Sequence, residues 1–471
     1  MKRATLVAGI LLAASALGAV DFPPLVPSRD ALKARREKFL GSLPPHSIAV
    51  LRSAPERRMS HDTEYLYRQD SDFYYLTGID EPDTTAVLRN DPSDGKRYVL
   101  FVRARDARRE AFEGARPGPQ GAAALYGADA AFAEAELATR LASWDPVTYR
   151  FSGYLAESER LYLSDGDDAV WAARFQKTYR DVRDRDFGPG VVGDAGEILH
   201  EMRLVKDEED LRFLRRAAEI SARGHVLAMG AAAPGKYEFE VQAALDGYCL
   251  ANGAHRMAYP SIVGSGPNSV TLHWSKNDRQ IQAGEVVLND SGAEYGLYAT
   301  DITRTYPASG TFSPEQRAIY AVVLDAQKKA MALVRPGTRH DDIEAAAARA
   351  QTEGLVKLGL LSGDVAQLLQ SKAYRKLTLH GVSHWVGLDV HDVGRYEKDG
   401  ASRELAAGMV FTIEPGIYIP ADTAGVDRKW WNIGVRIEDT VLVTKDGFDC
   451  LSCAAPREIE DVEKAVRSGR R

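Results

Sequence analysis

The chain contains little cysteine, with Cys249, Cys450 and Cys453 as the only cysteines in 471 residues. Three cysteines cannot all pair, and a chain of this length does not depend on disulfides for its stability. Cys450 and Cys453 form a CxxC pair, but a second such pair and a following βαβ pattern are lacking. We therefore interpret all three as packing cysteines, and a small-loop disulfide between Cys450 and Cys453 stays open for an oxidising compartment.

An excess of positive charge is also lacking. The chain has 60 Lys and Arg residues against 67 Asp and Glu residues, for a formal net charge of −7. A mildly acidic chain without a basic run lacks the electrostatic footprint of nucleic-acid binding and of a polybasic membrane patch. The hydrophobic share of 45% and the charged share of 27% are typical of a globular protein, and 471 residues predict two domains.

Long apolar runs are absent except near the N-terminus, which reads MKRATLVAGILLAASALGAVDF. Basic residues start it, residues 4–14 form an apolar core, and small residues follow, as in a secretory signal. The run falls short of the roughly 20 residues that a membrane span needs. We predict a signal peptide over residues 1–19, cleaved after Ala16 or Ala19, and an exported protein, periplasmic or secreted, without a stable membrane anchor.

The order of short strands and amphipathic helices predicts an α+β fold in two domains. Short β-rich runs alternate with polar segments in the first part, which indicates a smaller α/β domain that we place at 22–195. Gly, Pro and then charged residues cluster at 188–207 and mark the boundary. The second domain, placed at 205–468, follows the order helix–helix, strands, helix–helix, strands. The helices that we predict lie at about 123–143, 168–183, 208–229, 237–251, 313–335 and 340–358.

Two aspartates flank a predicted hairpin in the second domain. Two β-prone runs surround a turn signal at Tyr295-Gly296, which would set Asp290 directly opposite Asp301 with their Cβ atoms about 5 Å apart. Like charges at that spacing are destabilising unless a cation bridges them or one acid is protonated. Two solvated loop acids are the alternative, so the spacing alone leaves metal binding open.

Further acids and histidines lie in the last strand-rich block. Glu414 ends an apolar run, and Glu438 lies in an alternating strand where Arg436 could pair with it. His380, His384 and His391 are three of the ten histidines and fall within twelve residues. The first two have the spacing of a helical zinc motif, but the glycines around them disfavour a helix, so a conventional single-zinc site is excluded. Each histidine taken alone is better explained as a hydrogen-bonded structural residue.

The combination of these side chains is more informative than any one of them. Carboxylates with one or two imidazoles suit hard or borderline cations such as Mn²⁺, Co²⁺ or Zn²⁺. Four carboxylates could hold two such cations about 3.5–4 Å apart, a spacing that activates a bridging hydroxide. The residues therefore indicate a metal-assisted hydrolase.

Several separated motifs resemble those of one known family. The second domain carries IVGSG at 262–266, LHW at 272–274, DSG at 290–292, DITRT at 301–305, HGVSHWVGLDVHDVG at 380–394, IEPG at 413–416 and VRIED at 435–439. The first domain carries HDTEYLYRQDSDFYYLTG at 61–78. In this order, the strings resemble the pita-bread metallopeptidases, specifically aminopeptidase P, over nearly everything after the signal. The resemblance implies a pita-bread domain behind an aminopeptidase P-like N-terminal domain.

The resemblance also implies a ligand set for two divalent metal ions, with Mn expected first and Co or Zn as alternatives. One metal would be held by Asp290, Asp301 and Glu438. The other would be held by Asp301, His384, Glu414 and Glu438. Asp301 and Glu438 would thus bridge the two ions.

Roles in catalysis follow from the same resemblance. Glu414 would also take the proton of the attacking water, and His273 and His391 would contact substrate and stabilise the tetrahedral intermediate. His380 and Arg436 would lie near the proline side. The supporting hydrogen-bond network would consist of Asp62, Arg436 and Tyr418. Two positions depart from the family pattern: Asn289 replaces an apolar residue behind Asp290, and Phe112 stands where some relatives carry Trp.

The activity implied is hydrolysis of the bond between an N-terminal residue and a following proline in peptide substrates. A dedicated site is useful because the proline imide has no N–H and a fixed φ, so that sites gripping an extended backbone fail on it. The first alternative is a prolidase, which cleaves Xaa-Pro dipeptides on the same fold. A non-catalytic peptide-binding module and a methionine aminopeptidase are weaker alternatives, because the ligands are all present and the first domain is large. The resemblance further implies a homodimer or homotetramer.

Overall fold

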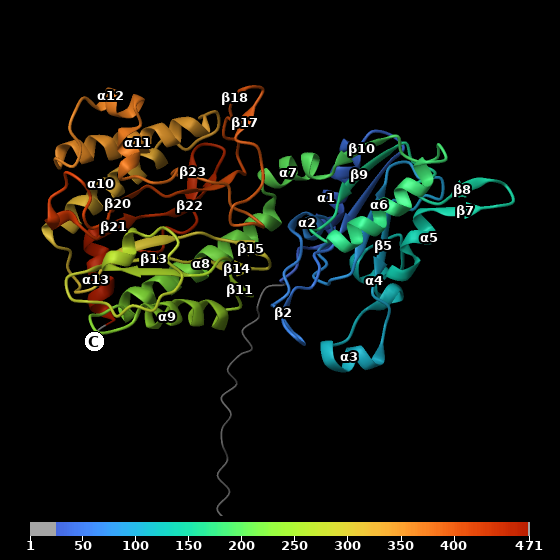
Figure 1. Cartoon of the computed structure of the whole chain (residues 1–471), viewed down its shortest axis with the longest axis horizontal. Helices are drawn as coiled ribbons and strands as arrows, with labels where there is room; N and C mark the ends of the chain where they lie inside the picture. The colour runs from blue at the N-terminus through green and yellow to red at the C-terminus, as the bar shows by residue number, and fades with distance from the viewer. Residues whose placement is uncertain (1–24, 470–471) are drawn as a thin grey trace, which may run out of the picture.

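The structure, a computed structural model, describes residues 25–469. The predicted signal peptide, residues 1–19, lies outside the described residues. Figure 1 shows an N-terminal lobe, from blue to green, and a C-terminal lobe, from green to red, with α7 (Gly196–Leu204) between them. None of the described helices is long and apolar enough to cross a membrane. The predicted α+β fold with a smaller α/β part in front is confirmed.

The N-terminal lobe is built on a six-stranded mixed sheet in the order β10-β9-β1-β4-β5-β6. The strands are β1 (Ser47–Arg52), β4 (Thr85–Arg89), β5 (Tyr98–Val102), β6 (Ala130–Ala133), β9 (Arg160–Ser164) and β10 (Val191–Asp194). β1 runs antiparallel to β4 and parallel to β9. Because β1, β4 and β5 are buried along their whole length, their sequences are nearly continuous apolar runs.

Helices cover both faces of this sheet. Ala49 and Leu51 of β1 belong to a core shared with α1 (Arg29–Ser42) and α2 (Ser71–Thr77). Ile48 and Val50 belong to a separate core that includes residues of α6 (Ala169–Arg183). This alternation follows from the two-residue period of a strand. The remaining elements of the lobe are β2 (Arg58–Ser60), β3 (Thr63–Glu64), α3 (Ala107–Glu113), α4 (Gly118–Tyr126), α5 (Leu137–Leu141), β7 (Ser143–Asp145) and β8 (Arg150–Ser152).

The C-terminal lobe repeats one arrangement of two helices followed by strands. The first half comprises α8 (Glu208–Ala231), α9 (Glu238–Ala251), β11 (Arg256–Met257), β12 (Ile262–Ser265), β13 (Val286–Asp290), β14 (Ala293–Tyr295), β15 (Tyr298–Ala299) and β16 (Thr303–Pro307). The second half comprises α10 (Pro314–Met331), α11 (His340–Lys357), α12 (Val365–Gln370), β17 (Glu397–Lys398), β18 (Ala401–Ser402), β19 (Val410–Ile413), β20 (Gly416–Ile419), β21 (Ile433–Arg436), β22 (Asp439–Val443), β23 (Phe448–Cys450) and α13 (Ile459–Ser468). The central sheets have the orders β12-β13-β16, β19-β22-β23 and β20-β21.

Most of the predicted helices form, and one does not. The capping box at the start of α10 is present, because the Ser313 hydroxyl accepts from the Gln316 amide and the Gln316 side chain accepts from the Ser313 amide. The predicted helix at 123–143 is wrong: α4 ends there, β6 follows, and α5 is a short separate helix. Gly127, with φ 67°, ends α4 in a left-handed conformation, and residues 130–133 then join the sheet beside β5.

The cysteines divide into two cases. Cys249 is fully buried in the main core, as a packing residue should be. Cys450 and Cys453 are joined by a disulfide, so the packing interpretation is wrong for this pair. The turn after β23 brings their Cα atoms to 5.5 Å, which lies within the range that a disulfide requires.

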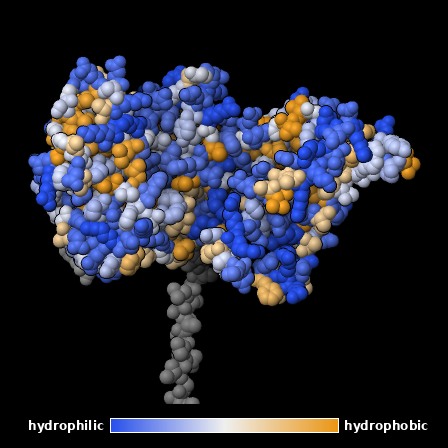
Figure 2. All heavy atoms as spheres, in the orientation of Figure 1, coloured by the Kyte–Doolittle hydropathy of each residue, from blue (hydrophilic) through white to orange (hydrophobic). Residues whose placement is uncertain are grey.

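The outer surface is mostly hydrophilic, with separate apolar patches (Figure 2). In this view the seam between the two lobes is also lined mainly by hydrophilic residues. Beneath this surface one buried apolar core extends through both lobes and includes Tyr75 of the N-terminal lobe and Phe213 of the C-terminal lobe.

Candidate metal centre

One cavity of the C-terminal lobe, with a volume of ≈ 580 Å³, brings together nearly all of the predicted site residues. Its lining includes the five predicted ligands Asp290, Asp301, His384, Glu414 and Glu438. It also includes the predicted substrate-side residues His273, His380, His391 and Arg436. Both halves of the lobe contribute to it, since the two aspartates come from the first half and the other ligands come from the second.

Asp290 and Asp301 lie close together, but not as the hairpin pattern predicts. Asp290, the last residue of β13, pairs with Thr303 rather than with Asp301. The turn is centred on Gly296 and Leu297, which have φ of 59° and 68°, one residue later than predicted. A turn shifted by one residue moves the cross-strand partner by two, so the prediction of directly opposed aspartates is wrong.

Tyr259 links the two aspartates across this offset. Its hydroxyl oxygen lies 2.6 Å from Asp290 Oδ1 and 2.5 Å from Asp301 Oδ1. One hydroxyl proton can serve only one acceptor at a time. The second short contact therefore marks a place where negative charges crowd together.

Glu414 and His384 are placed by one edge of β19. The segment before His384 runs alongside this strand, because the Glu414 amide donates to the Val382 carbonyl and the Thr412 amide donates to the His384 carbonyl, each at 2.8 Å. Glu414 directly follows β19. Its carboxylate therefore leaves the strand beside the imidazole, with His384 Nε2 3.5 Å from Glu414 Oε1.

Glu438 occupies the centre of the ligand cluster. It lies between β21 and β22 and is 1% exposed. Its amide donates to the Thr303 carbonyl at 3.0 Å, and its Oε2 accepts from the Thr303 hydroxyl at 2.7 Å. These two bonds fix the carboxylate against β16, next to Asp290 and Asp301.

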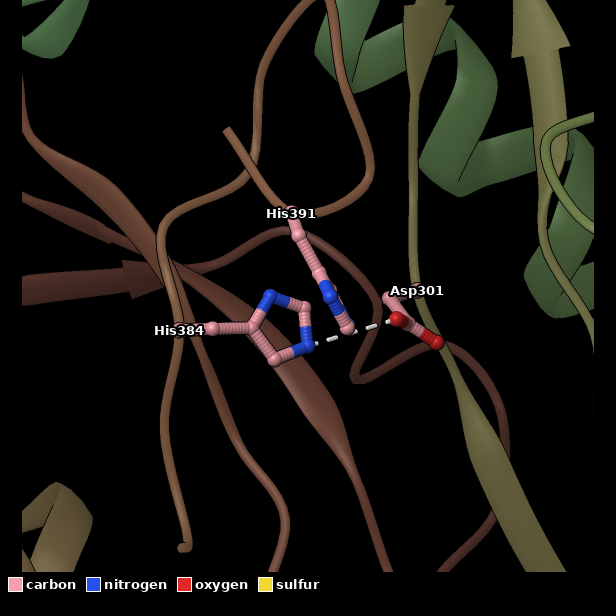
Figure 3. Close-up of side chains that lie close together, drawn as sticks. All are labelled: Asp301, His384 and His391. Carbon is pink, nitrogen blue, oxygen red and sulfur yellow. Dashed lines mark ion pairs between the residues drawn. The ribbon is translucent and has the colours of Figure 1, made fainter. Parts of the chain in front are cut away.

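The ligand atoms form overlapping groups. Asp290, Asp301 and Glu438 offer oxygens that all lie within 4.8 Å of one another, and His384, Glu414 and Glu438 form a second group by the same measure. His384 Nε2 is also 3.5 Å from Asp301 Oδ2. Figure 3 shows this imidazole directed toward Asp301, with His391 alongside it at a ring distance of 4.2 Å. Both groups therefore share Glu438 in the way that two adjacent cations would require.

The electrostatics of the cluster show that it needs positive charge. Burial, reinforced by the charges of Asp301 and Glu414, raises the pKa of Glu438 well above its ordinary range. Burial also raises the pKa of Glu414 to about 8, against the opposing charges of His384 and Arg436. Burial alone would lower the pKa of His384. Hydrogen bonding to Asp301 and the charge of Glu414 outweigh burial and raise this pKa to about 9. Divalent cations would take the place of these protons, so the donor set fits such ions.

Arg436 connects the ligands to the substrate side of the cavity. Its Nη2 lies 2.5 Å from Asp290 Oδ2, so this arginine pairs with Asp290 rather than with Glu438, its predicted partner within the strand. Its Nη1 donates to the Tyr418 hydroxyl at 2.8 Å, and that hydroxyl lies 2.7 Å from His380 Nε2. Burial lowers the pKa of His380 to about 4, so the neutral imidazole can accept the Tyr418 proton.

Asp62 does not take part in this network. It lies in the exposed turn between β2 and β3, whereas the Arg436 guanidinium donates to Asp290, Tyr418 and Thr303. The prediction that Asp62 belongs to the network within one chain is therefore wrong. The prediction fails because the segment 61–78 begins in a surface hairpin of the N-terminal lobe and enters the core only at α2.

Sequence reasoning missed Tyr259 and Thr303, which hold the ligands in place. Their contacts reach across 31 and 135 residues, and although the DITRT string contains Thr303, no local pattern assigns a role to either residue. The two departures from the family pattern have clear places. Asn289 is buried behind Asp290 and donates to the Tyr306 hydroxyl at 3.3 Å, which satisfies its polar side chain. Phe112 lies on α3 and is 86% exposed.

Buried carboxylates and an imidazole in overlapping ligand groups, within an open cavity, define a metal-dependent hydrolase. Residues 212–445 match the model of Metallopeptidase family M24, and residues 32–145 match that of the Aminopeptidase P N-terminal domain. The chain is 38% identical to the Xaa-Pro aminopeptidase of Escherichia coli strain K12, over 94% of this chain and 99% of that protein. It therefore belongs to the Xaa-Pro aminopeptidase, or aminopeptidase P, family of divalent-metal peptidases.

Solved structures and a human relative agree with this assignment. Aminopeptidase PepP of Pseudomonas aeruginosa superposes with a TM-score of 0.90 at 38% identity, covering 95% of this chain and 100% of that one. E. coli aminopeptidase P with the inhibitor Pro-Leu gives a TM-score of 0.88 at 38% identity, covering 94% and 99%. Human Xaa-Pro aminopeptidase 3 is 35% identical over 88% of this chain and 80% of its own length. The pita-bread fold that the motifs imply is thus confirmed.

Proposed function

We propose that this protein removes the N-terminal residue from peptides whose second residue is proline, using two divalent cations, with Mn²⁺ as the first choice and Co²⁺ or Zn²⁺ as alternatives. The observation that carries the proposal is the cavity in which two ligand groups sharing Glu438 lie beside His273, His380 and His391. Oxygen-rich ligands with one imidazole suit these ions. The relatives named Xaa-Pro aminopeptidase support the substrate class.

The residues of the cavity divide the chemical work. Asp290, Asp301 and Glu438 would hold one cation, and Asp301, His384, Glu414 and Glu438 would hold the other. When bound, the cations supply Lewis acidity and lower the pKa of water. Glu414 accepts the proton of the attacking water, a role that fits a carboxylate placed beside His384 on the wall of the cavity. His273 and His391 donate hydrogen bonds to the oxygen on which charge develops.

The remaining walls of the cavity suit a proline ring. Ile262, Leu272 and Val390 supply apolar surface on the same cavity as the ligands. His380 is held by Tyr418 at the edge of this surface. A rigid ring that fills such a pocket contributes binding without needing the amide N–H that proline lacks.

The contacts of Arg436 favour an aminopeptidase over a prolidase. A prolidase must grip the free carboxylate of a dipeptide with a cation. Arg436 is 3% exposed, and its guanidinium already donates to Asp290, Tyr418 and Thr303. It is therefore committed to the ligands rather than available to the end of a substrate.

A proline-containing tripeptide is expected to lose its first residue, and the same tripeptide with alanine in place of proline should react at least about tenfold more slowly, because an apolar pocket loses the group that fills it. The measurement is kcat/KM for the matched pair with Mn²⁺ fixed, with the products identified by mass spectrometry. Equal rates for the pair, or cleavage at another bond, would contradict the proposed specificity.

We also propose that the signal peptide predicted over residues 1–19 is removed on export to the periplasm or the exterior, by cleavage after Ala16 or Ala19. The basic start, apolar core and small-residue end of this segment motivate this proposal. Mass spectrometry of the purified mature protein should find a start near Leu17 or Val20. An intact Met1 in the cytoplasmic fraction would contradict export.

We further propose that the mature protein is a homodimer or homotetramer. Sedimentation velocity of the purified protein measures its mass in solution, and a monomer would contradict this proposal.

A further inference from the structure

A single loop, Gly387–Asp392, forms a wall between the catalytic cavity and a second cavity. Val390 and His391 line the catalytic cavity. Asp389 lines the second cavity, of ≈ 470 Å³, whose other walls include Arg68 and Ser71 of the N-terminal lobe. The loop therefore faces the ligand cluster on one side and the other lobe on the opposite side.

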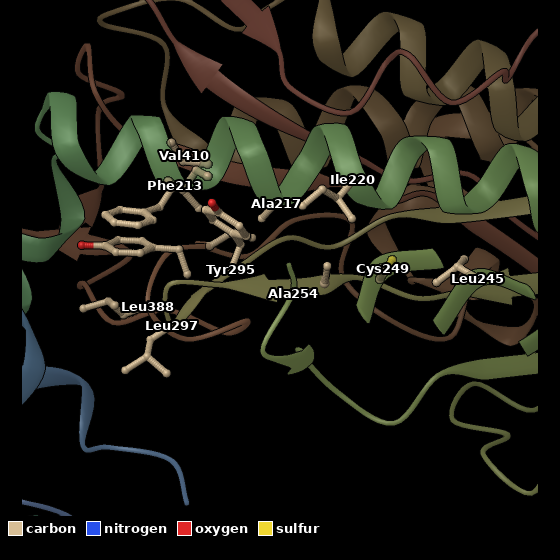
Figure 4. Packing of buried hydrophobic residues seen from close by; sticks show 14 of the residues in the cluster. Phe213, Ala217, Ile220, Leu245, Cys249, Ala254, Tyr295, Leu297, Leu388 and Val410 are labelled. Carbon is tan, nitrogen blue, oxygen red and sulfur yellow. The ribbon is translucent and has the colours of Figure 1, made fainter. Parts of the chain in front are cut away.

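The N-terminal lobe holds the first part of this loop. The Ser71 hydroxyl donates to Asp389 Oδ1 at 2.7 Å. Arg68 lies 3.4 Å from the same carboxylate and also donates to the Leu388 carbonyl. Leu388 itself is 2% exposed in the main core, where Figure 4 shows it in the region of Leu297. Three kinds of contact thus fix the loop just before His391.

Arg203, on the helix between the lobes, holds both parts of the loop. Its Nη2 lies 2.7 Å from Asp389 Oδ2 and 2.6 Å from Asp392 Oδ1. Its Nη1 lies 2.7 Å from Asp72 of the N-terminal lobe, which fixes the guanidinium from the far side. Lys206 completes the set at 2.8 Å from Asp392 Oδ2. Both basic side chains and Asp392 are at most 3% exposed, so the two ion pairs of Asp392 are shielded from solvent.

His391 has no such packing of its own. Its side chain is exposed, and its ring meets the ligand cluster at His384, 4.2 Å away. The position of the imidazole is therefore set mainly by the backbone of a loop that is fixed at Asp389 and at Asp392. A misplacement of about 1 Å can cost on the order of 10²-fold in rate when a group must meet a transition state.

We propose that Arg68, Ser71 and Asp72 of the N-terminal lobe, together with Arg203, position His391 for catalysis by fixing the loop Gly387–Asp392. The N-terminal lobe would then be a working part of the active site. This proposal rests on the role of His391 in the proposed function. The residues named are positioning residues, because they act through the loop and touch neither substrate nor ligands.

Asp389→Ala tests the proposal with little risk to folding, because this side chain is 36% exposed. Its matched control is Asp94→Ala: Asp94 is 37% exposed and lies 2.7 Å from the buried Arg89 of the N-terminal sheet. We expect Asp389→Ala to lower kcat about tenfold with little change in KM, Ser71→Ala to have a smaller effect of the same kind, and Asp94→Ala to have none. The metal content of each variant is measured alongside.

The decisive comparison repeats Asp389→Ala in a His391→Ala background. If Asp389 acts through His391, adding Asp389→Ala to the His391→Ala variant should lower kcat by less than about twofold. Equal losses in both backgrounds would overturn the proposal. Hydrogen exchange of the backbone amides at 387–392 gives a readout that needs no turnover, and it should accelerate in Asp389→Ala but not in Asp94→Ala. Unchanged exchange would also overturn it, whereas a wild-type enzyme inactive on proline peptides would overturn only the proposed function.

Discussion

Replacing Glu414 by glutamine is expected to lower kcat by at least about 10²-fold, the loss that removal of a general base typically causes. The carboxylate leaves β19 beside His384, in the same cavity as Asp301 and Glu438. Glutamine keeps the shape and one oxygen but cannot accept the proton of water. The loss should therefore appear in kcat more strongly than in KM.

Glu285→Gln is a suitable control for this variant. Glu285 lies on the same lobe, pairs with Arg279 at 2.6 Å and is not part of the cavity lining. The Glu285→Gln substitution removes a carboxylate charge without touching the site, so the turnover of this variant should stay close to that of the wild type. Near-normal turnover of a folded, metal-loaded Glu414→Gln variant would show that another group accepts the proton.

Removal of metal is expected to abolish hydrolysis, and Mn²⁺ or Co²⁺ should restore it. Asp290, Asp301, Glu414 and Glu438 are four carboxylates gathered on one cavity, and Arg436 is the arginine among its lining residues. Without cations, burial raises the pKa of Glu414 to about 8 and the pKa of Glu438 well above its ordinary range, which favours the protonated carboxyl groups. A protonated cluster can neither polarise a carbonyl nor activate water.

The same experiment has a structural readout. Because the cations bind the folded state, metal removal should lower Tm, and the shift should reverse when the ion is returned. Atomic absorption measures how much metal remains after dialysis against a chelator. Full activity in a sample with no measurable metal would exclude a metal-dependent mechanism.

Local patterns predict the parts of the fold that local energies decide. The capping box at Ser313 and the amphipathic run of α8 are signals within a few residues, and the structure contains both helices. The turn at Gly296-Leu297 lies one residue beyond its predicted place, because leucine rarely adopts a φ of 68° and gives no sign that it will. The sequence of β6 resembles that of a helix, because the pairing with β5 that makes it a strand is a tertiary contact.

The site is predictable only in part for similar reasons. Spacing alone leaves Asp290 and Asp301 open to two interpretations, and the motif resemblance supplies the ligand set that the cavity gathers. Tyr259 and Thr303 escape prediction, since they reach the ligands only through the folded chain. The prediction for Asp62 fails within one chain because a shared motif does not say where its residues will lie, and Asp62 lies in a surface hairpin of the N-terminal lobe. The contact that Asp389 makes across 318 residues has no local signal either.

Comparison of matched di-, tri- and pentapeptides tests the central claim most directly. All carry the same first residue followed by proline, and kcat/KM is measured with Mn²⁺ fixed. An aminopeptidase leaves the carbonyl side of proline open, so the tripeptide and pentapeptide should be cleaved well and the dipeptide poorly. If the dipeptide is favoured by about tenfold or more, roughly 1.4 kcal/mol of transition-state preference, the protein is a prolidase and the proposed aminopeptidase activity is contradicted.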